Sequence, residues 1–314
     1  MPTLRAKKSS KRVRRQPTKS ARSHAALRLL VALDEAGAHA NAVIDTAKAL
    51  TKAHCAKAEA MSVVDPMAAA WLTVGVPVAT VGEAMVRGEQ RLRRLEIRRY
   101  LADRTGARPP WRIRVPLGRP ADAILDAAHG ADLVIMGLRR ERLIERIVHD
   151  ATTPHVVREC TAPVLAVTPE LRGMPRTVVI AADFSAESNA AARLACRLFT
   201  GCAKFVFVHI ESDFDAAIAN LDEVTRMVRE NDWAAAFQGL IETLSVPAGA
   251  KVETVVVHGT VPRTLLAFAG RRGADVLVVG RQRHDGDESL LVGSVTAALV
   301  RRAPCSLLIT PPAV

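Results

Sequence analysis

The stretch GADVLVVG, residues 273–280, has the composition of a buried parallel strand that is entered and left through glycine. A basic loop follows it and leads to Gly293-Ser294, where we expect a helix to begin. A buried strand that leads through such a loop to a helix N-terminus presents backbone N–H groups to an anion, usually a phosphate. The stretch therefore predicts an α/β fold with an anion-binding site beside the carboxyl end of this strand.

The same frame occurs a second time, 143 positions earlier, as GADLVIMG at residues 130–137. There, Asp150-Ala151 stands where the later copy has Gly293-Ser294, so we expect only the later copy to keep the anion-binding chemistry. A repeated frame indicates a duplicated chain, and the length suits two domains of about 140 to 150 residues each. The expected organisation is a basic disordered tail at 1–23, a first domain at 24–168, a linker at 169–175 and a second domain at 176–314.

Apolar runs of strand length alternate with segments of helical periodicity in both domains. The expected strands are 26–33, 57–64, 111–115, 133–136 and 163–167, followed by 177–181, 204–210, 252–257, 276–279 and 305–309. This alternation predicts two similar α/β domains, each a Rossmann-like open five-stranded parallel sheet with helices on both faces. In such sheets, ligands bind beyond the carboxyl ends of the strands, at the topological switch point.

The positive charge of the chain is concentrated at its start. The formal net charge is +12, but residues 1–22 hold nine basic residues and no acid, which leaves +3 for the rest. Such a tail is typical of a solvated extension or of an arm that contacts nucleic acid or another anionic surface. A transit peptide is a third reading, which the small number of apolar residues in the tail disfavours.

The five cysteines are odd in number and form no CxxC pair, which predicts free thiols in a reducing compartment. The apolar region at 71–85 is interrupted by Gly75, Pro77 and Gly82, so we expect no membrane span. We therefore expect a cytoplasmic protein.

Three sets of residues in the second domain resemble the nucleotide-binding members of the universal stress protein family. That family has glycine, two residues, glycine, nine residues, and then glycine with Ser or Thr. Here Gly280 is followed after two residues by Arg283 and after nine more by Gly293-Ser294, so the spacing is intact and one glycine is lost. The other matches are Asp183-Phe184-Ser185 and His209-Ile210. The resemblance extends over nearly the whole chain after the tail, and it implies a tandem universal stress protein.

The resemblance implies that the second domain binds an adenine nucleotide, with ATP as the first choice and Mg²⁺ as a possible companion. ADP, AMP or a cyclic nucleotide would share the adenosine contacts. Physical reasoning agrees, because a carboxylate suits a ribose hydroxyl or Mg²⁺ and a glycine before a helix lets its backbone approach an anion. We also expect Arg281, Arg283 and His284 to add positive charge beside the phosphates. The implied binding residues are Asp183, Ser185, Ile210, Gly280, Arg283, Gly293, Ser294 and Val295.

Arg283 leaves two alternatives open: its side chain either fills the phosphate space or turns outward and grips the phosphates. In the first domain, the carboxylate of Asp150 would repel a polyphosphate, and Ala151 lacks a hydroxyl. That domain, whose matching positions also include Asp34, Val63, Gly137 and Arg140, is therefore predicted to be a structural partner.

The last strands of the two domains, 164–167 and 307–309, are short and apolar, and family members dimerise through that edge. They predict either internal pairing of the two domains or pairing with a neighbouring chain.

No nucleophile with its base and no water-activating base is found, so slow ATP hydrolysis is the most that we expect of catalysis. The acidic cluster at 285–288, beside His284, is interpreted as a solvated turn rather than a metal site. Two alternatives to nucleotide binding remain: an interaction protein with both pockets closed, and a nucleic-acid-associated protein that acts through its tail.

Overall fold

The computed structural model describes residues 26–34, 37–65, 83–106, 111–138, 152–211, 223–282 and 294–312. Within these ranges, ten strands form one continuous sheet in the order β3-β2-β1-β4-β5-β10-β9-β6-β7-β8. The strands of the first half are β1 (Arg28–Ala32), β2 (Lys57–Met61), β3 (Arg112–Arg114), β4 (Leu133–Gly137) and β5 (Val164–Val167). The strands of the second half are β6 (Thr177–Ala181), β7 (Lys204–Glu211), β8 (Lys251–His258), β9 (Val276–Gly280) and β10 (Ser306–Thr310).

Within each half, all neighbouring strands are parallel. The half-orders β3-β2-β1-β4-β5 and β8-β7-β6-β9-β10 are the same arrangement used twice. The predicted fold class, two similar parallel α/β domains of five strands each, is therefore confirmed. The expected strand at 26–33 is shorter in the structure, because hydrogen-bonded pairing begins only at Arg28 and ends at Ala32.

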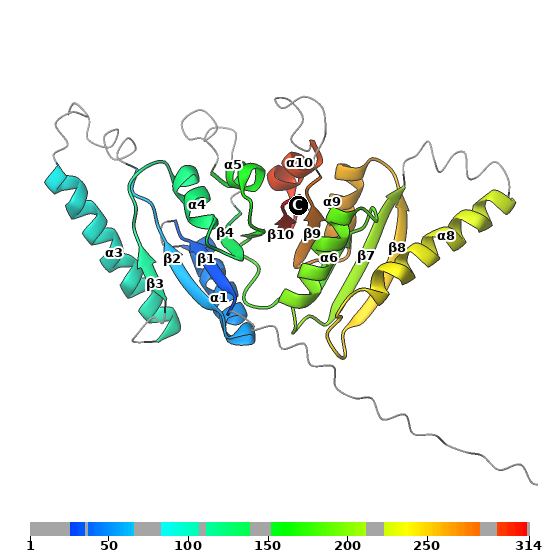
Figure 1. Ribbon diagram of the computed structural model, residues 1–314, viewed down its shortest axis with the longest axis horizontal. Coiled ribbons are helices and arrows are strands. Elements are labelled where there is room, and N and C mark those ends of the chain that lie inside the picture. The colour runs from blue at the N-terminus through cyan, green and yellow to red at the C-terminus, as the bar shows by residue number, and fades with distance from the viewer. Residues whose placement is uncertain are drawn as a thin grey trace, which may run out of the picture.

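The two halves join through their last strands, which pair with one another within the chain. β10 runs antiparallel to β5, with Leu307 opposite Ala166 and Ile309 opposite Val164. Next to this pair, the fully buried Ser306 hydroxyl accepts a hydrogen bond from the backbone N–H of Thr168 at 3.0 Å. Each strand thereby covers the open edge of the other half-sheet, which would otherwise present unpaired N–H and C=O groups. Figure 1 shows β9 and β10 near the centre of the molecule, with the two halves on either side.

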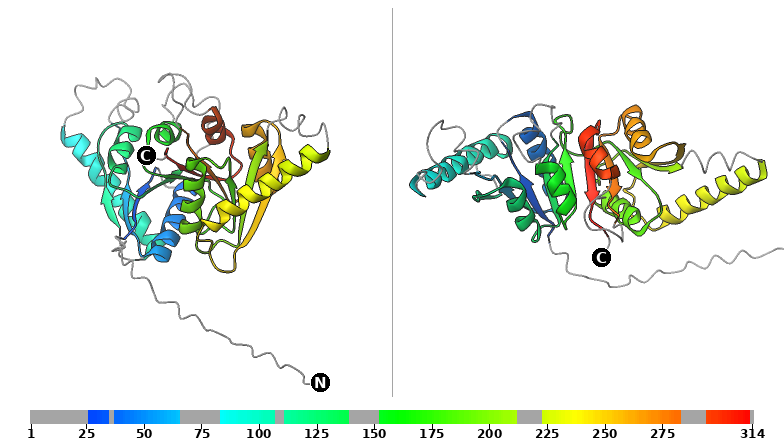
Figure 2. Two further views of the ribbon diagram at one scale, coloured as in Figure 1. Left: turned by 45° about the vertical axis from the view of Figure 1, so that its right-hand side comes forward. Right: turned by 90° about the horizontal axis from the view of Figure 1, so that it is seen from above.

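Helices cover both faces of the sheet, because successive side chains of a buried parallel strand point to opposite faces and are apolar on both. Among the described helices, one face packs against α1 (Ala38–His54), α3 (Glu83–Thr105), α6 (Ala186–Leu198) and α8 (Glu223–Glu242). The other face packs against α4 (Pro120–Ala128), α5 (Thr152–Glu159), α9 (Val261–Arg271) and α10 (Ser294–Arg302). Seen from above in Figure 2, α3 and α8 lie at the two opposite ends of the molecule. In the part of the chain that the structure describes, no helix has both the length and the apolar character that crossing a bilayer requires.

Candidate functional site

The candidate site lies at the switch point of the second half, beside the central strand β6. β6 pairs with β7 on one side and with β9 on the other, and all three are parallel. Their carboxyl ends therefore meet at one edge, which places Asp183, Ile210 and Gly280 together there. Ile210 and Val295 of α10 both pack against the core under α9 and α10, so these two expected residues share one face of the sheet.

Two of the other expected site residues, Arg283 and Gly293, lie outside the described residues, and Ser294 begins α10. Among the remaining sequence features, the basic tail, Arg140, Asp150-Ala151 and residues 284–288 also lie outside them.

Asp183 is held by hydrogen bonds from two directions. Its Oδ1 accepts from the backbone N–H of Ser185 at 3.0 Å and from the Ser185 hydroxyl at 2.5 Å. Its Oδ2 accepts from the side-chain amide of Gln282 at 2.7 Å. Partial burial by itself would raise the pKa of Asp183, but hydrogen bonds from Ser185, Ser188 and the backbone outweigh it and lower that pKa below the ordinary value. The side chain is therefore a charged acceptor in a fixed orientation at neutral pH.

The turn after Asp183 is built to hold this orientation. Ser185 is the N-cap of α6, and its hydroxyl oxygen accepts a hydrogen bond from the backbone N–H of Ser188 at 3.1 Å. Phe184 has a φ of 63°, in the left-handed region that a bulky residue adopts only when its surroundings hold it there. Those surroundings are aromatic: ring centroids lie 5.8 Å away in Trp233, 5.3 Å away in His209 and 5.1 Å away in Phe237.

His209 ties this aromatic cluster to the end of β6, since its Nδ1 lies 2.8 Å from the backbone carbonyl of Ala182. Its ring also packs on Trp233 at a centroid distance of 4.1 Å. The cluster thus fixes Phe184 from the α8 side, while the carboxylate of Asp183 is left at the exposed edge. The site is preorganised around one carboxylate.

Gly280 is needed because the first turn of α6 crosses directly over it. A Cβ atom at this position would lie 2.5 Å from the carbonyl carbon of Glu187 and 2.8 Å from the backbone nitrogen of Ser188. Both atoms belong to the backbone, so no rotation of a side chain could make room. The glycine at the end of β9 therefore has a packing role that the spacing of the motif alone does not reveal.

Arg281 does not point toward the candidate phosphate space, and the expectation that it adds positive charge there is wrong. Its guanidinium crosses to the first domain and donates hydrogen bonds to the backbone carbonyls of Val157, Arg158 and Cys160, the last at 2.9 Å. These carbonyls end α5, whose C-terminus carries a partial negative charge that favours a cation. Burial lowers the pKa of Arg281, although the nearby Cys160 and Glu159 oppose this shift. The acceptors of Arg281 thus belong to a helix end of the other domain, which the sequence alone did not indicate.

The matching edge of the first domain has the same frame with different contacts. A Cβ atom added to Gly137 would lie 3.4 Å from the Cβ of His39, which is a side-chain contact at ordinary range. The Nε2 of His39 lies 3.1 Å from the carbonyl oxygen of Leu138, so its ring lies beside the end of β4. α1 follows Gly37, which provides no side-chain cap. The side chain of His39 therefore occupies the place beside Gly137 that helix backbone occupies beside Gly280 in the second domain.

Sequence reasoning identified Asp183 but missed two features around it, Gln282 and the aromatic cluster. Gln282 lies two residues after the glycine of the motif, and no pattern distinguishes a glutamine that reaches across the sheet edge from one that faces solvent. Trp233 and Phe237 are separated from Phe184 by about fifty residues, but their spacing of four on one helix face was a usable signal. Among the described residues, no three His, Cys, Asp or Glu side chains gather as a metal site. Asp183 thus supplies one carboxylate, which suits a cation that takes its other ligands from a phosphate.

The family model for the universal stress protein family matches this chain twice, at residues 26–168 and 174–311. The chain belongs to the universal stress protein family. Its two matches make it a tandem member, with one family domain in each half of the sheet.

Three relatives illustrate the similarity. Universal stress protein MJ0531 of Methanocaldococcus jannaschii is 31% identical over 61 residues, a match that spans 19% of this chain and only 36% of that protein. The crystal structure of a universal stress protein from Archaeoglobus fulgidus has a TM-score of 0.65 and 18% identity, and the match covers 91% of this chain and 96% of that one. A universal stress protein solved in complex with cAMP is 26% identical, with a TM-score of 0.32 over 44% of this chain and 98% of that chain. The Archaeoglobus structure shares the fold along nearly the whole length.

Proposed function

We propose that this tandem universal stress protein is a regulatory, cytoplasmic protein that binds one adenine nucleotide, with ATP as the first choice, in its second domain. The observation that carries the proposal is the oriented carboxylate of Asp183 at the switch point between β6 and β9. Its lowered pKa keeps it charged, so that it can accept a hydrogen bond from a ribose hydroxyl or hold a Mg²⁺ that also contacts phosphate. All five cysteines are in the thiol form rather than in disulfides, which fits a reducing compartment.

The other expected residues complete the binding site in the proposal. Ile210 and Val295 supply partly buried apolar surface on the same face, which suits an adenine ring. Gly293 and Ser294 come immediately before and at the start of α10, where helix N–H groups favour the phosphates. Arg283 is assigned to grip the phosphates, because the Arg281 beside it is already engaged with the first domain. Ser185 acts through Asp183 rather than by direct contact, since its hydroxyl already donates to that carboxylate and caps α6.

Equilibrium dialysis with labelled ATP and Mg²⁺ tests the proposal on the full chain. We expect one ATP per chain for the wild type and about a tenfold weaker Kd for Asp183→Asn, because a charged acceptor becomes neutral. The matched control is Asp34→Asn, the equivalent change after β1 of the first domain, which should leave the Kd unchanged. Gly293→Asp provides a second test, because it places a negative charge where the phosphates are proposed to bind. Equal weakening by Asp183→Asn and Asp34→Asn would contradict a site confined to the second domain.

A second candidate function is an interaction protein that holds no nucleotide. It is favoured by the contact between Gln282 and Asp183, because both carboxylate oxygens already have partners within the protein. Two results would support this alternative over the first: no ATP retained by the wild type, and none retained by Gln282→Ala, in which Oδ2 is released. Retention by Gln282→Ala alone would instead show that this glutamine closes a working nucleotide site.

A further inference from the structure

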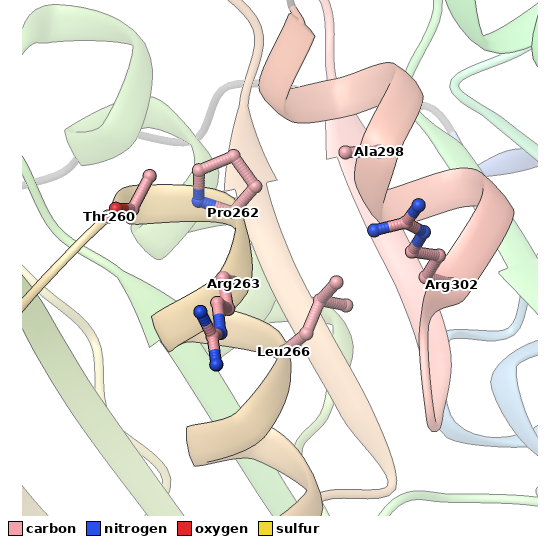
Figure 3. A pocket seen from close by; sticks show the side chains of 6 residues that line it. All are labelled: Thr260, Pro262, Arg263, Leu266, Ala298 and Arg302. Carbon is pink, nitrogen blue, oxygen red and sulfur yellow. The ribbon is translucent and has the colours of Figure 1, made fainter.

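A hollow of about 320 Å³ lies between α9 and α10 of the second domain. The residues that line it are Thr260, Pro262, Arg263, Leu266, Ala298 and Arg302. Figure 3 shows Leu266 extending from α9 into the space between the two helices and Arg302 projecting from α10 toward α9. The hollow thus has an apolar floor with the guanidinium of Arg302 beside it. Arg263 also lines the hollow, and Figure 3 shows its guanidinium turned along α9, away from α10. The hollow is separate from Asp183 and from the aromatic cluster, none of which lines it.

The two arginines of the hollow have no partner among the residues that the structure describes. Neither Arg263 nor Arg302 makes an ion pair or a side-chain hydrogen bond with any residue that the structure describes, and both are exposed. Arg272, near the end of α9, shows the contrasting case: it pairs with Glu253 at 2.6 Å and lies over the ring of Phe268. Thr260 precedes α9 without using its side chain as a cap, so its hydroxyl is also available to a ligand.

The first domain shows that this positive charge is not required by the fold. The buried pair Ile124 and Ala128 of α4 corresponds to Leu265 and Ala269 of α9, which places Asp122 at the position of Arg263. The buried pairs of α5 and α10, Val156-Val157 and Leu299-Val300, correspond in the same way and place Glu159 at the position of Arg302. Both arginines of the second domain are therefore carboxylates in the first, and the helix pairs pack in both cases.

We infer that the hollow between α9 and α10 binds a small organic phosphate, a phosphomonoester whose apolar group rests on Pro262, Leu266 and Ala298. A guanidinium group binds phosphate oxygens through a pair of parallel hydrogen bonds, which Arg302 can offer on the α10 side. Arg263 is exposed, so rotation of its side chain would bring a second positive charge to the same dianion. The volume is at the lower end of small-molecule pockets, which suits one ring or a short chain rather than a dinucleotide. This site is independent of the proposed nucleotide site, and either one could exist without the other.

The test uses the full chain and phenyl phosphate as the probe, with titration calorimetry as the measurement. We expect saturable binding that is at least about tenfold weaker in Arg263→Gln and in Arg302→Gln, because each removes one bidentate partner. Arg271→Gln and Arg301→Gln are matched controls: both are exposed arginines of the same two helices, and neither lines the hollow. These controls should leave the Kd within about twofold of the wild type.

Two further arms separate the apolar and the nucleotide contributions. Inorganic phosphate should bind more weakly than phenyl phosphate if the apolar floor takes part, and equal affinity would overturn the organic part of the inference. Gly293→Asp should leave the binding of phenyl phosphate unchanged, and its loss would place the probe in the proposed nucleotide site instead. No binding by the wild type, or equal losses in Arg301→Gln and Arg302→Gln, would overturn the site altogether.

Discussion

The ends of β4 and β9 share one sequence frame, yet the two domains use it differently. In the second domain, helix backbone lies directly over Gly280, and Ser185 caps that helix while holding Asp183. In the first domain, the atoms nearest to a Cβ added at Gly137 belong to the side chain of His39, and α1 starts without a side-chain cap. The duplicated frame therefore determines where each strand ends. The helix that packs over the last glycine of the strand determines how tightly that end of the strand is held.

The largest effect is expected from adding a methyl group at Gly280. Gly280→Ala would push a Cβ atom into the backbone of Glu187 and Ser188, which costs about 1–3 kcal/mol of unfolding free energy by overpacking. Gly137→Ala is the matched control and should cost less than about 1 kcal/mol, since the atom it meets is a side-chain carbon. Urea unfolding of both variants measures the comparison. Equal losses would show that the two helices approach their strands alike.

The second-largest effect is expected at Arg281, a residue of the second domain whose side chain donates hydrogen bonds to the first domain. Its counterpart in the first domain is the buried Leu138, whose side chain has no donor for a reciprocal hydrogen bond. Arg281→Ala should lower the unfolding free energy by about 1.5 kcal/mol, because three carbonyls at the end of α5 lose a charged donor. Hydrogen exchange of the amides in α5 should speed up more than that in α4. Unchanged exchange in α5 would contradict the link.

A smaller effect is expected from exchanging the helix caps. Ser185→Ala should cost about 1 kcal/mol through the lost cap of α6. Gly37→Ser should raise the unfolding free energy of the first domain by about a few tenths of a kcal/mol. The reason is that the backbone of Gly37 is extended and a Cβ there meets nothing within 4 Å. Thermal unfolding of the two variants and of the double variant measures both changes. A destabilising Gly37→Ser would show that α1 starts in a manner that a cap cannot improve.

The smallest effect concerns pH and Asp183. Because the pKa of this carboxyl is lowered in the folded protein, its contribution to stability is present at neutral pH and is lost as the pH falls through that lowered value. The difference in unfolding free energy between the wild type and Asp183→Asn should therefore be constant from about pH 5 to pH 8 and shrink below about pH 4. Denaturation midpoints at several pH values measure it. A difference that is the same at about pH 3 and pH 7 would mean that the carboxylate contributes nothing as a charge.

Several elements were predicted closely because their signals are local. The strand at Thr177–Ala181 has the bounds that its apolar run predicts, and β9 ends one residue later than predicted, at Gly280. Asp183 was found for the same reason, since it directly follows a buried strand at a switch point. Arg281 was misplaced because its sequence neighbours are strand and loop, whereas its partners lie more than 120 residues away.

The sequence by itself determined that the chain is a duplicated α/β protein, that each copy has five strands, and that the second copy alone has glycine and serine at its helix start. Those properties follow from hydrophobic period and residue type, which act between near neighbours. Only the tertiary structure decided that β5 and β10 close the sheet on each other, that Arg281 caps a helix of the other domain, and that Gln282 meets Asp183. These contacts join residues about a hundred or more positions apart, and their geometry is set by how the halves pack, which no local pattern encodes.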